Sequence, residues 1–426
     1  FHSQLDFIKN RITETLGDLY GMHWPFKQHK TSRNIKLSPY HEELKEAGAC
    51  FGVSGGYERP MWFALNGNKT EYEYSYNYQN WYPSAEYETT NTVTNVGLFD
   101  LTPFSKYEIK SKKAHQELQK ICTSNIKNEI GKSTYTHMLN KDGGIETDLT
   151  VICIDENHFR IISSAATRER DKFHIKKHLT DGIELKDVTD DYCVLGLFGP
   201  KSRNLISKIS KDDFTNEILK FGNGKYVTID TKKVWVQRLS YVGELGFEIY
   251  IEKNDAKEVY QSIVKEGKNY NLSHCGSHAM DTMRMESGFL HWGHDISPEE
   301  NQYQAGLSFT ISYKKKMAFI GKQALEKIKN KKQTKRFIML SLKNSSPGQP
   351  LLLHDEPIYL EDVIIGRTTS GNYSFNYKKN ISFGYVDSIY TDDELTNKDL
   401  YIEVAKKKHQ AIVERKPLKN KYVKFS

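Results

Sequence analysis

The chain has 426 residues, 38% of them hydrophobic and 12% aromatic, which is enough apolar material for two or three domains. The charged fraction of 27% is near the average for globular proteins and argues against extensive disorder. The sequence contains no apolar run of the roughly 20 residues that a membrane span needs and opens on no secretion signal, so we expect no membrane partner.

The positive charge is modest and lies in clusters. Much of the net charge of +7 comes from basic runs at residues 314–316 and 327–336, a pattern typical of solvated loops or linkers. A nucleic-acid groove would interleave basic with aromatic residues, so we expect no nucleic-acid partner. A basic mouth for the anionic tail of a ligand is the alternative.

The five cysteines lie far apart and include no CxxC pair. This usage fits a reducing compartment, the cytoplasm or, in a eukaryote, the mitochondrial matrix, and argues against a disulfide framework. We therefore expect buried structural thiols.

The first 37 residues are predicted to be the tail of a larger unit. Apolar residues recur with helical spacing from Leu5 to Leu19, and Pro25 then stops the helix. Because the first residue is Phe1 rather than Met, we expect further sequence upstream.

Residues 38–313 alternate irregularly between predicted strands and helices. This favours an α+β fold with antiparallel sheets over a doubly wound parallel sheet. The glycines at 52–56 have the wrong spacing for a dinucleotide fingerprint. The predicted strands cover 106–110, 148–153, 226–229 and 247–251, and the predicted helices 113–122, 168–178, 201–209 and 256–266.

The last part of the chain is predicted to be a basic linker at 314–336, with a short helix at 321–328, followed by a small β-barrel at 337–426. Short apolar runs separated by turn residues are typical of such barrels. The predicted strands cover 337–342, 357–360, 363–365 and 400–404.

The first candidate site is a predicted hairpin at 135–151. Its return strand alternates, with Ile145, Thr147, Leu149 and Val151 on one face and Glu146, Asp148 and Thr150 on the other. Aspartate is disfavoured inside strands, so Asp148 is either a solvent-facing acid or a carboxylate directed into a cleft for proton transfer.

The second candidate site is the segment 240–249, which combines two glycines with two acids. A carboxylate here can accept two hydrogen bonds from an amidine-like edge, and Tyr241 can stack on the same ring. An ordinary hairpin turn with surface acids is the alternative.

The third candidate is a predicted helix from 277 to about 286, followed by His291, His294 and Asp295. Arg284 and Glu286 have structural ion pairs as their alternative interpretation. The histidine spacing matches no zinc pattern, so we expect no metal site. The sequence also contains no GxSxG elbow that would indicate a serine hydrolase.

Together these segments resemble the folate-binding aminomethyltransferase fold of glycine-cleavage T-proteins and, more closely, the carboxy-terminal half of dimethylglycine and sarcosine dehydrogenases. The likeness rests on Gly-Gly-Ile-Glu-Thr-Asp-Leu-Thr at 143–150 and Tyr-Val-Gly-Glu-Leu-Gly-Phe-Glu at 241–248. It extends to 99–102, 197–200 and 378–386, and so covers nearly the whole chain. The segments at 21–26, 47–52 and 57–63 resemble the junction that follows the flavin domain in the dehydrogenase branch.

The resemblance implies tetrahydrofolate as cofactor, FAD only in a missing upstream domain, and a small N-methylated amino acid as the other partner. Asp148 falls on the family's catalytic aspartate, which would orient N10 of the folate and assist its proton loss. Glu248 falls on the glutamate that holds the pterin. The other expected cofactor-binding residues are Tyr241, Tyr135, Phe104, Ser164 and Glu244.

Two positions depart from the T-protein pattern. Met280 stands where T-proteins often carry arginine, as in the dehydrogenase branch, and Gln304 stands where an acid is usual. The expected function is capture of the one-carbon unit of dimethylglycine or sarcosine as 5,10-methylenetetrahydrofolate. The alternatives are a stand-alone aminomethyltransferase and a folate-binding module associated with RNA modification. The sequence leaves the oligomeric state open, and a homo-oligomer is one of the options.

Overall fold

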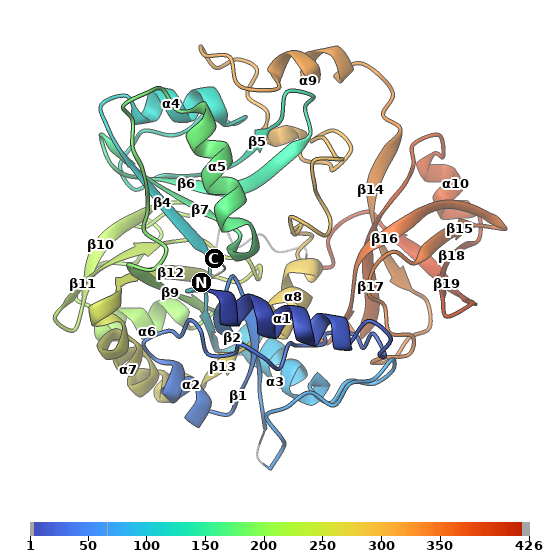
Figure 1. Cartoon of the computed structure of the whole chain (residues 1–426), viewed down its shortest axis with the longest axis horizontal. Coiled ribbons are helices and arrows are strands. Elements are labelled where there is room, and N and C mark those ends of the chain that lie inside the picture. The colour runs from blue at the N-terminus through green and yellow to red at the C-terminus, as the bar shows by residue number, and fades with distance from the viewer. Residues whose placement is uncertain (1–3, 66, 420–426) are drawn as a thin grey trace.

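Two sheets and a closed barrel form the framework of the chain (Figure 1). The structure is a computed structural model that describes residues 4–65 and 67–419; residues 1–3 and 420–426, which the predicted tail and barrel include, lie outside this part. Among the named strands, one pair is parallel, β13 (Leu272–Cys275) beside β3 (Val96–Asp100), and the others are antiparallel. The predicted α+β class with antiparallel sheets is therefore confirmed.

The six-stranded sheet is buried on both faces and has the order β10-β11-β12-β9-β3-β13. Helices α6 (Ser202–Ile209) and α7 (Ala256–Gly267) pack on one face through Leu205 and Ile263. On the other face Trp235 and Tyr250 pack in one apolar cluster with Ile152 of the second sheet. The remaining strands are β9 (Tyr192–Phe198), β10 (Gly224–Ile229), β11 (Lys232–Gln237) and β12 (Gly246–Glu252).

The five-stranded sheet has the order β5-β6-β7-β4-β8 and is covered by two helices, α4 (Ala114–Ile121) and α5 (Arg168–His178). The alternation predicted for its longest strand is confirmed: the odd-numbered residues 145–151 are buried and the even-numbered residues 146–150 are partly exposed. Asp148 therefore lies on the face away from the α4 and α5 core. The strands are β4 (Ser105–Lys110), β5 (Ser133–Leu139), β6 (Ile145–Asp155), β7 (His158–Ser163) and β8 (Leu185–Asp187).

The predicted small barrel is also confirmed and is closed in the order β14-β17-β16-β15-β18-β19. It packs against α8 (Ser277–Glu286) through β16 (Val363–Ser374). Residues 370, 372 and 374 of β16 bond to Arg284, Asp281 and Glu286 of α8. The other elements are β14 (Lys335–Leu342), β15 (Pro357–Leu360), β17 (Lys379–Asp387), β18 (Leu400–Val404), β19 (Lys407–Glu414) and α10 (Asp392–Asn397).

The amino-terminal segment forms helix α1 (Leu5–Gly17), which lies across the other units and has no buried residue (Figure 1). The helix ends at Gly17, whereas the predicted helical spacing continues to Leu19. Its carboxylate Glu14 accepts hydrogen bonds from the backbone of Lys30 and Thr31. A hairpin and two helices connect it to the first sheet: α2 (His41–Glu46), β1 (Ala49–Ser54), β2 (Tyr57–Phe63) and α3 (Tyr82–Thr94).

One expectation for the basic segment is wrong. Lys315 does not extend into solvent: its ammonium group donates to the backbone carbonyls of Gln119, Cys122 and Ser124 at the end of α4. Burial lowers its pKa to about 8. The predicted short helix is present as α9 (Lys322–Ile328).

All five cysteines are buried free thiols, as expected. Within residues 4–65 and 67–419, no helix is both long and apolar enough to cross a bilayer. Four short 3₁₀ turns complete the secondary structure: η1 (Ala165–Thr167), η2 (Lys253–Asp255), η3 (Lys268–Tyr270) and η4 (Ser308–Thr310).

Candidate functional site

Asp148 is positioned by a tight hairpin between β5 and β6. In the turn, the side-chain oxygen of Asn140 accepts hydrogen bonds from the backbone N–H groups of Asp142 and Gly144. A side chain at Gly144 would bring its Cβ to 2.0 Å from the carbonyl oxygen of Pro298, so only glycine fits there. The register that follows places Asp148 directly opposite His137.

Asp148, Tyr135 and His137 form a hydrogen-bonded group on this face. The Tyr135 hydroxyl lies 3.3 Å from Oδ2 of Asp148 and 3.2 Å from Nε2 of His137. Nδ1 of His137 lies 3.0 Å from Oγ1 of Thr310, whose hydroxyl donates to the carbonyl of Leu307. Because Thr310 gives its proton to Leu307, it accepts from Nδ1–H, and Nε2 is left as an acceptor. Tyr135 therefore donates either to His137 or to Asp148.

The electrostatic environment makes Asp148 a proton-exchanging group near neutral pH. Burial is the largest cause that raises its pKa, to about 7, and the negative charge of Asp171 adds to it. His137 is deeply buried, which lowers its pKa to about 3 and keeps the ring neutral. An acid with a pKa near neutrality can both take up and release a proton during turnover.

Tyr135 and Asp148 both keep some accessible surface. Tyr135 keeps 39% of its surface accessible, yet burial is the largest cause that raises the pKa of its hydroxyl. Asp148, partly exposed by area, behaves in the same way.

Glu248 lies in β12 between two strands of the six-stranded sheet, opposite Gln237 of β11 and Gly196 of β9. The Tyr250 hydroxyl donates to its Oε2 over 2.7 Å. Burial raises the pKa of Glu248. Oε1 has no protein hydrogen bond among the described residues and is available to a ligand N–H.

Tyr241 and Phe104 join the two carboxylates through one apolar cluster. Both rings pack against a group of buried side chains that includes Tyr250 and Met280. The Tyr241 hydroxyl donates to the carbonyl of Leu290, and its pKa is raised mainly by burial and to a smaller extent by the negative charge of Asp148. Tyr241 thus lies within electrostatic range of Asp148 and beside the apolar wall next to Glu248.

The turn that carries Phe104 is held by a buried lysine. The ammonium group of Lys106 donates to the carbonyls of Thr102 and Phe104, at 2.8 and 2.7 Å. Burial lowers the pKa of Lys106 to about 7.

The positions that depart from the T-protein pattern have structural contacts: Met280 lies in the apolar cluster, and Gln304 donates to the hydroxyl of Thr334.

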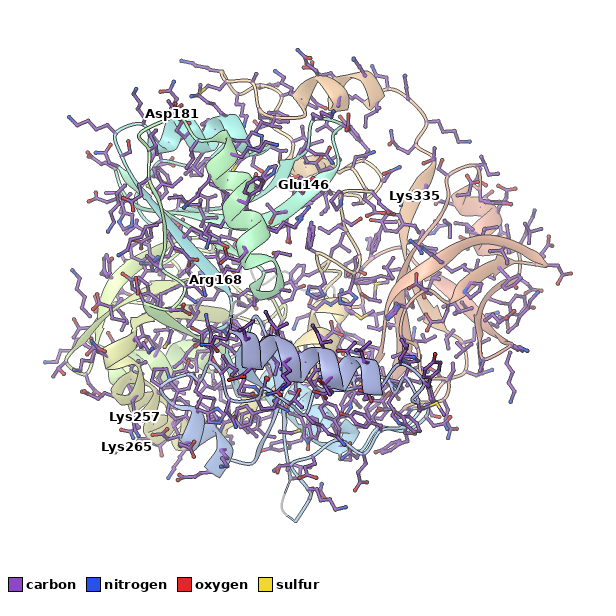
Figure 2. All side chains as sticks on the ribbon, viewed as in Figure 1. Glu146, Arg168, Asp181, Lys257, Lys265 and Lys335 are labelled. Carbon is purple, nitrogen blue, oxygen red and sulfur yellow. The ribbon has the colours of Figure 1, made fainter. Side chains whose placement is uncertain are left out.

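Two further residues predicted to bind the cofactor, Ser164 and Glu244, have hydrogen-bond or ion-pair partners within the protein. Ser164 accepts a hydrogen bond from the backbone of Ala166 and so caps η1. Arg168, labelled in Figure 2, follows this turn and pairs with Asp187. Glu244 forms an ion pair with Lys419, near the carboxy-terminal end of the described chain. The structure thus brings together Asp148, Tyr135, Tyr241, Phe104 and Glu248, and gives Ser164 and Glu244 partners of their own.

His137 and Thr310 were missed from the sequence. They are 173 residues apart, so no local pattern joins them. The sequence does place His137 two residues after Tyr135, and this spacing indicates that the two side chains lie on the same face of the strand.

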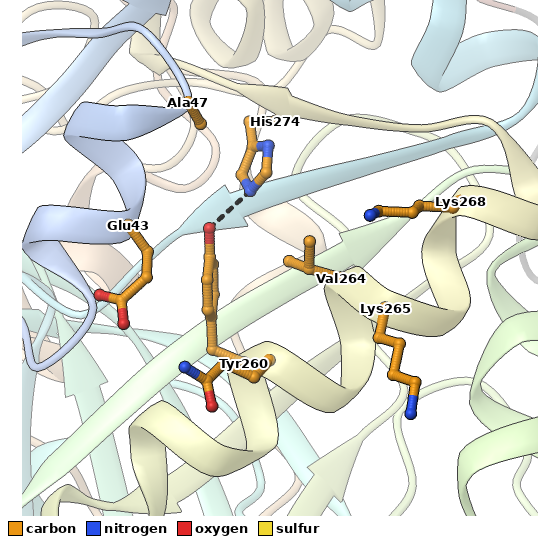
Figure 3. A pocket seen from close by; sticks show the side chains of 8 residues that line it. Glu43, Ala47, Tyr260, Val264, Lys265, Lys268 and His274 are labelled. Atoms are coloured by element: carbon orange, nitrogen blue, oxygen red, sulfur yellow. Dashed lines mark hydrogen bonds between the residues drawn. The ribbon is translucent and has the colours of Figure 1, made fainter.

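Two surface depressions lie elsewhere. One, with a volume of about 290 Å³, is lined by Tyr260, Val264 and His274, and the Tyr260 hydroxyl lies 2.7 Å from Nε2 of His274 (Figure 3). The other is bordered by Lys208 and Asp230. Neither contains a predicted site residue. Across the described residues, His, Cys, Asp and Glu side chains form no group of three or more that could hold a metal ion.

Two family models match most of the chain. Residues 40–315 match the GCVT N-terminal domain, and residues 335–419 match the glycine cleavage T-protein C-terminal barrel domain. The chain belongs to the glycine cleavage T-protein family. Residues 1–38 of this T-protein-family chain match the FAD dependent oxidoreductase central domain. The resemblance inferred from the sequence is therefore confirmed.

Two curated relatives are longer than this T-protein-family chain. The 4-methylaminobutanoate oxidase (formaldehyde-forming) of Paenarthrobacter nicotinovorans is 34% identical over 413 residues, 97% of this chain and 49% of the relative. The mitochondrial dimethylglycine dehydrogenase of Rattus norvegicus is 30% identical over 379 residues, 88% of this chain and 43% of the relative. The chain thus spans less than half the length of either.

A solved structure shows the same fold. The glycine cleavage system aminomethyltransferase T from Bartonella henselae superposes with a TM-score of 0.76, at 22% identity, over 90% of this chain and 98% of its own.

Proposed function

We propose that this chain carries out tetrahydrofolate-dependent one-carbon transfer within a flavin-dependent enzyme that demethylates an N-methyl amino acid. The one-carbon unit of dimethylglycine or sarcosine, oxidised elsewhere in that enzyme, is captured as 5,10-methylenetetrahydrofolate. The observation that carries the proposal is Asp148, a carboxyl group with a pKa of about 7 that shares the Tyr135 hydroxyl with neutral His137.

The residues present fit a reduced folate. Glu248 offers Oε1 as an acceptor for ring N–H groups, while Tyr250 fixes the other oxygen. Tyr241 and Phe104 provide aromatic surfaces beside it. When bound, tetrahydrofolate supplies the two nitrogens, N5 and N10, that hold the one-carbon unit.

The chemical role falls to Asp148. As a carboxylate it accepts a proton from a nitrogen that loses one, and it stabilises positive charge at that position. Tyr135 follows the change, because its hydroxyl donates to Asp148 when Asp148 is ionised. When Asp148 is protonated, the hydroxyl donates to His137 and its oxygen accepts from the carboxyl O–H of Asp148. The protein thereby keeps a hydrogen bond on Asp148 in both states.

The flavin part of the proposal is supported by the amino-terminal match to an FAD dependent oxidoreductase domain and by the two longer relatives. A stand-alone aminomethyltransferase is the second candidate, since the Bartonella structure of that type is covered over 98% of its length. The length of the complete gene distinguishes the two.

Calorimetric titration with tetrahydrofolate tests the proposal. We expect Glu248→Gln to weaken binding by about tenfold or more, because it removes charge-assisted hydrogen bonds. Asp148→Asn is expected to change binding by less than about threefold, since its role is proton transfer. Glu252→Gln, at the exposed end of the same strand, is the matched control and should bind like the wild type. A folded wild-type chain that does not bind tetrahydrofolate contradicts the proposal.

A further inference from the structure

Arg59 differs from every other arginine in the described part of the chain. Each of the others has a hydrogen bond or an ion pair, as Arg33 has with Glu58 and Arg284 with Asp295. Arg59 makes neither within that part, and its Nε is shielded from solvent without a partner. Burial lowers its pKa. A desolvated positive charge without a partner is costly unless an anion completes it.

Arg59 is held rigidly where the amino-terminal segment meets the first sheet. It lies in β2 opposite Gly52 of β1. A Cβ on Gly52 would come within 2.7 Å of Gln28 Oε1 and 2.9 Å of Met61, so this face of the hairpin is tightly packed. The hydroxyl of Ser277, at the start of α8, donates to the carbonyl of Pro60 and fixes β2 against that helix.

The polar neighbours of Arg59 bond to other groups, although Oδ2 of Asp100 is buried without a hydrogen-bond partner. Tyr72, Asp100 and Asp281 are in electrostatic range of its guanidinium. The Tyr72 hydroxyl bonds to His278, Asp100 accepts from Tyr40, and Asp281 accepts from Arg284. The terminal nitrogens of Arg59, unlike Nε, are not sealed from solvent and have no protein acceptor. Their fork geometry suits a planar anion.

This position adjoins the candidate site. Arg59 lies in β2, which Ser277 fixes against α8, and the charge of Asp281 in α8 acts on both Arg59 and Tyr241. Tyr241 in turn is in range of Asp148. Gln28, which belongs to the segment that matches the flavin oxidoreductase domain, lies beside Gly52, the strand partner of Arg59.

We propose that Arg59 is a carboxylate-binding position, at which the terminal guanidinium nitrogens hold the carboxylate of a ligand that reaches the Asp148 site. The inference rests on the proposed function and adds a recognition residue to it. Two ligands carry this group: the small N-methylated amino acid and the glutamate of the folate. The position beside Gln28 favours the amino acid, which would enter from the flavin side.

Titrations with paired probes test the assignment on the full chain. N,N-dimethylglycine is compared with trimethylamine, and tetrahydrofolate with 6-methyltetrahydropterin; each second compound lacks the carboxylate. We expect Arg59→Met to weaken dimethylglycine binding by about tenfold, because a bidentate charged contact is lost, and to leave the pterin probe unchanged. Arg59→Lys should restore part of the affinity. Arg367→Met, at an exposed arginine of the barrel, is the control.

The outcomes separate the two proposals. Weakened dimethylglycine binding supports the amino acid as ligand, and weakened tetrahydrofolate binding with unchanged pterin binding supports the folate glutamate. If a folded Arg59→Met chain binds both carboxylate probes like the wild type, or if the folded wild type binds neither, the assignment is wrong. If tetrahydrofolate and 6-methyltetrahydropterin do not bind while dimethylglycine still binds through Arg59, the proposed folate function is contradicted and the Arg59 assignment is not.

Discussion

At the scale of single residues, the charge of Asp148 depends on two neighbours of opposite effect. Burial is the largest cause that raises its pKa, the negative charge of Asp171 adds to the rise, and the Tyr135 hydroxyl lowers it; the pKa that results is about 7. Below about pH 7 the group is therefore mainly protonated, and above that it is a carboxylate. If the carboxylate is the active form, one-carbon transfer should rise with pH through this range.

Replacing Asp171 by asparagine should lower the pKa of Asp148. Asp171 is buried in α5, and its negative charge disfavours a second charge on Asp148. We expect the pKa to move below about 7, with severalfold more carboxylate at about pH 6. Titration of the Asp148 carboxyl carbon by nuclear magnetic resonance measures it. Asp155→Asn, at the exposed end of β6, is the control; an unchanged Asp148 titration in Asp171→Asn would contradict the electrostatic account.

The sequence predicted the residues whose signal is local. Asp148 stood out because aspartate is rare inside an alternating strand, and Tyr135 lay in the same hairpin. Thr310 and Lys419 could not be found in this way, because their contacts with His137 and Glu244 join distant parts of the chain. Local patterns predict which side chains share a face, but not which remote group approaches that face.

At the scale of elements, some segments were predicted to the residue and others were missed. The predicted helix at 168–178 and the strands at 357–360 and 400–404 agree with the structure to the residue. Strands β3 and β9 were not predicted. Nearly all of their residues are buried, so they lack the alternation that marks a half-buried strand.

The contact of Lys315 with the end of α4 should stabilise the fold measurably. Its ammonium group supplies protons to carbonyls that the helix leaves without partners. Lys315→Met should therefore reduce the free energy of unfolding by about 1–3 kcal/mol, the usual cost of leaving buried acceptors unpaired. Urea denaturation measures the change. Lys314→Met, at the exposed neighbouring position, should stay within about 0.5 kcal/mol of the wild type. Equal stability of both variants would show that the contact contributes nothing.

At the scale of the whole molecule, helix α8 connects the candidate site to the barrel. Its polar residues bond to one face of β16, and its first turn is fixed to β2 through Ser277. The Tyr241 ring stacks on Phe289, just after the helix. The position of the barrel therefore affects the residues that surround the proposed ligand.

Asp295 is the side chain on which this connection most depends. It is 1% exposed and accepts hydrogen bonds from Arg284, the backbone of His291, Thr369 and Ser370. Asp295→Ala leaves the Arg284 charge buried with one partner fewer, and breaking such a pair costs about 3–5 kcal/mol. We expect the barrel to unfold separately, so that scanning calorimetry resolves two transitions where the wild type has one. Asp355→Ala, an exposed barrel aspartate paired with Arg367, should keep the wild-type profile. A single transition with unchanged midpoint in Asp295→Ala would mean that the barrel is held by its apolar contacts alone.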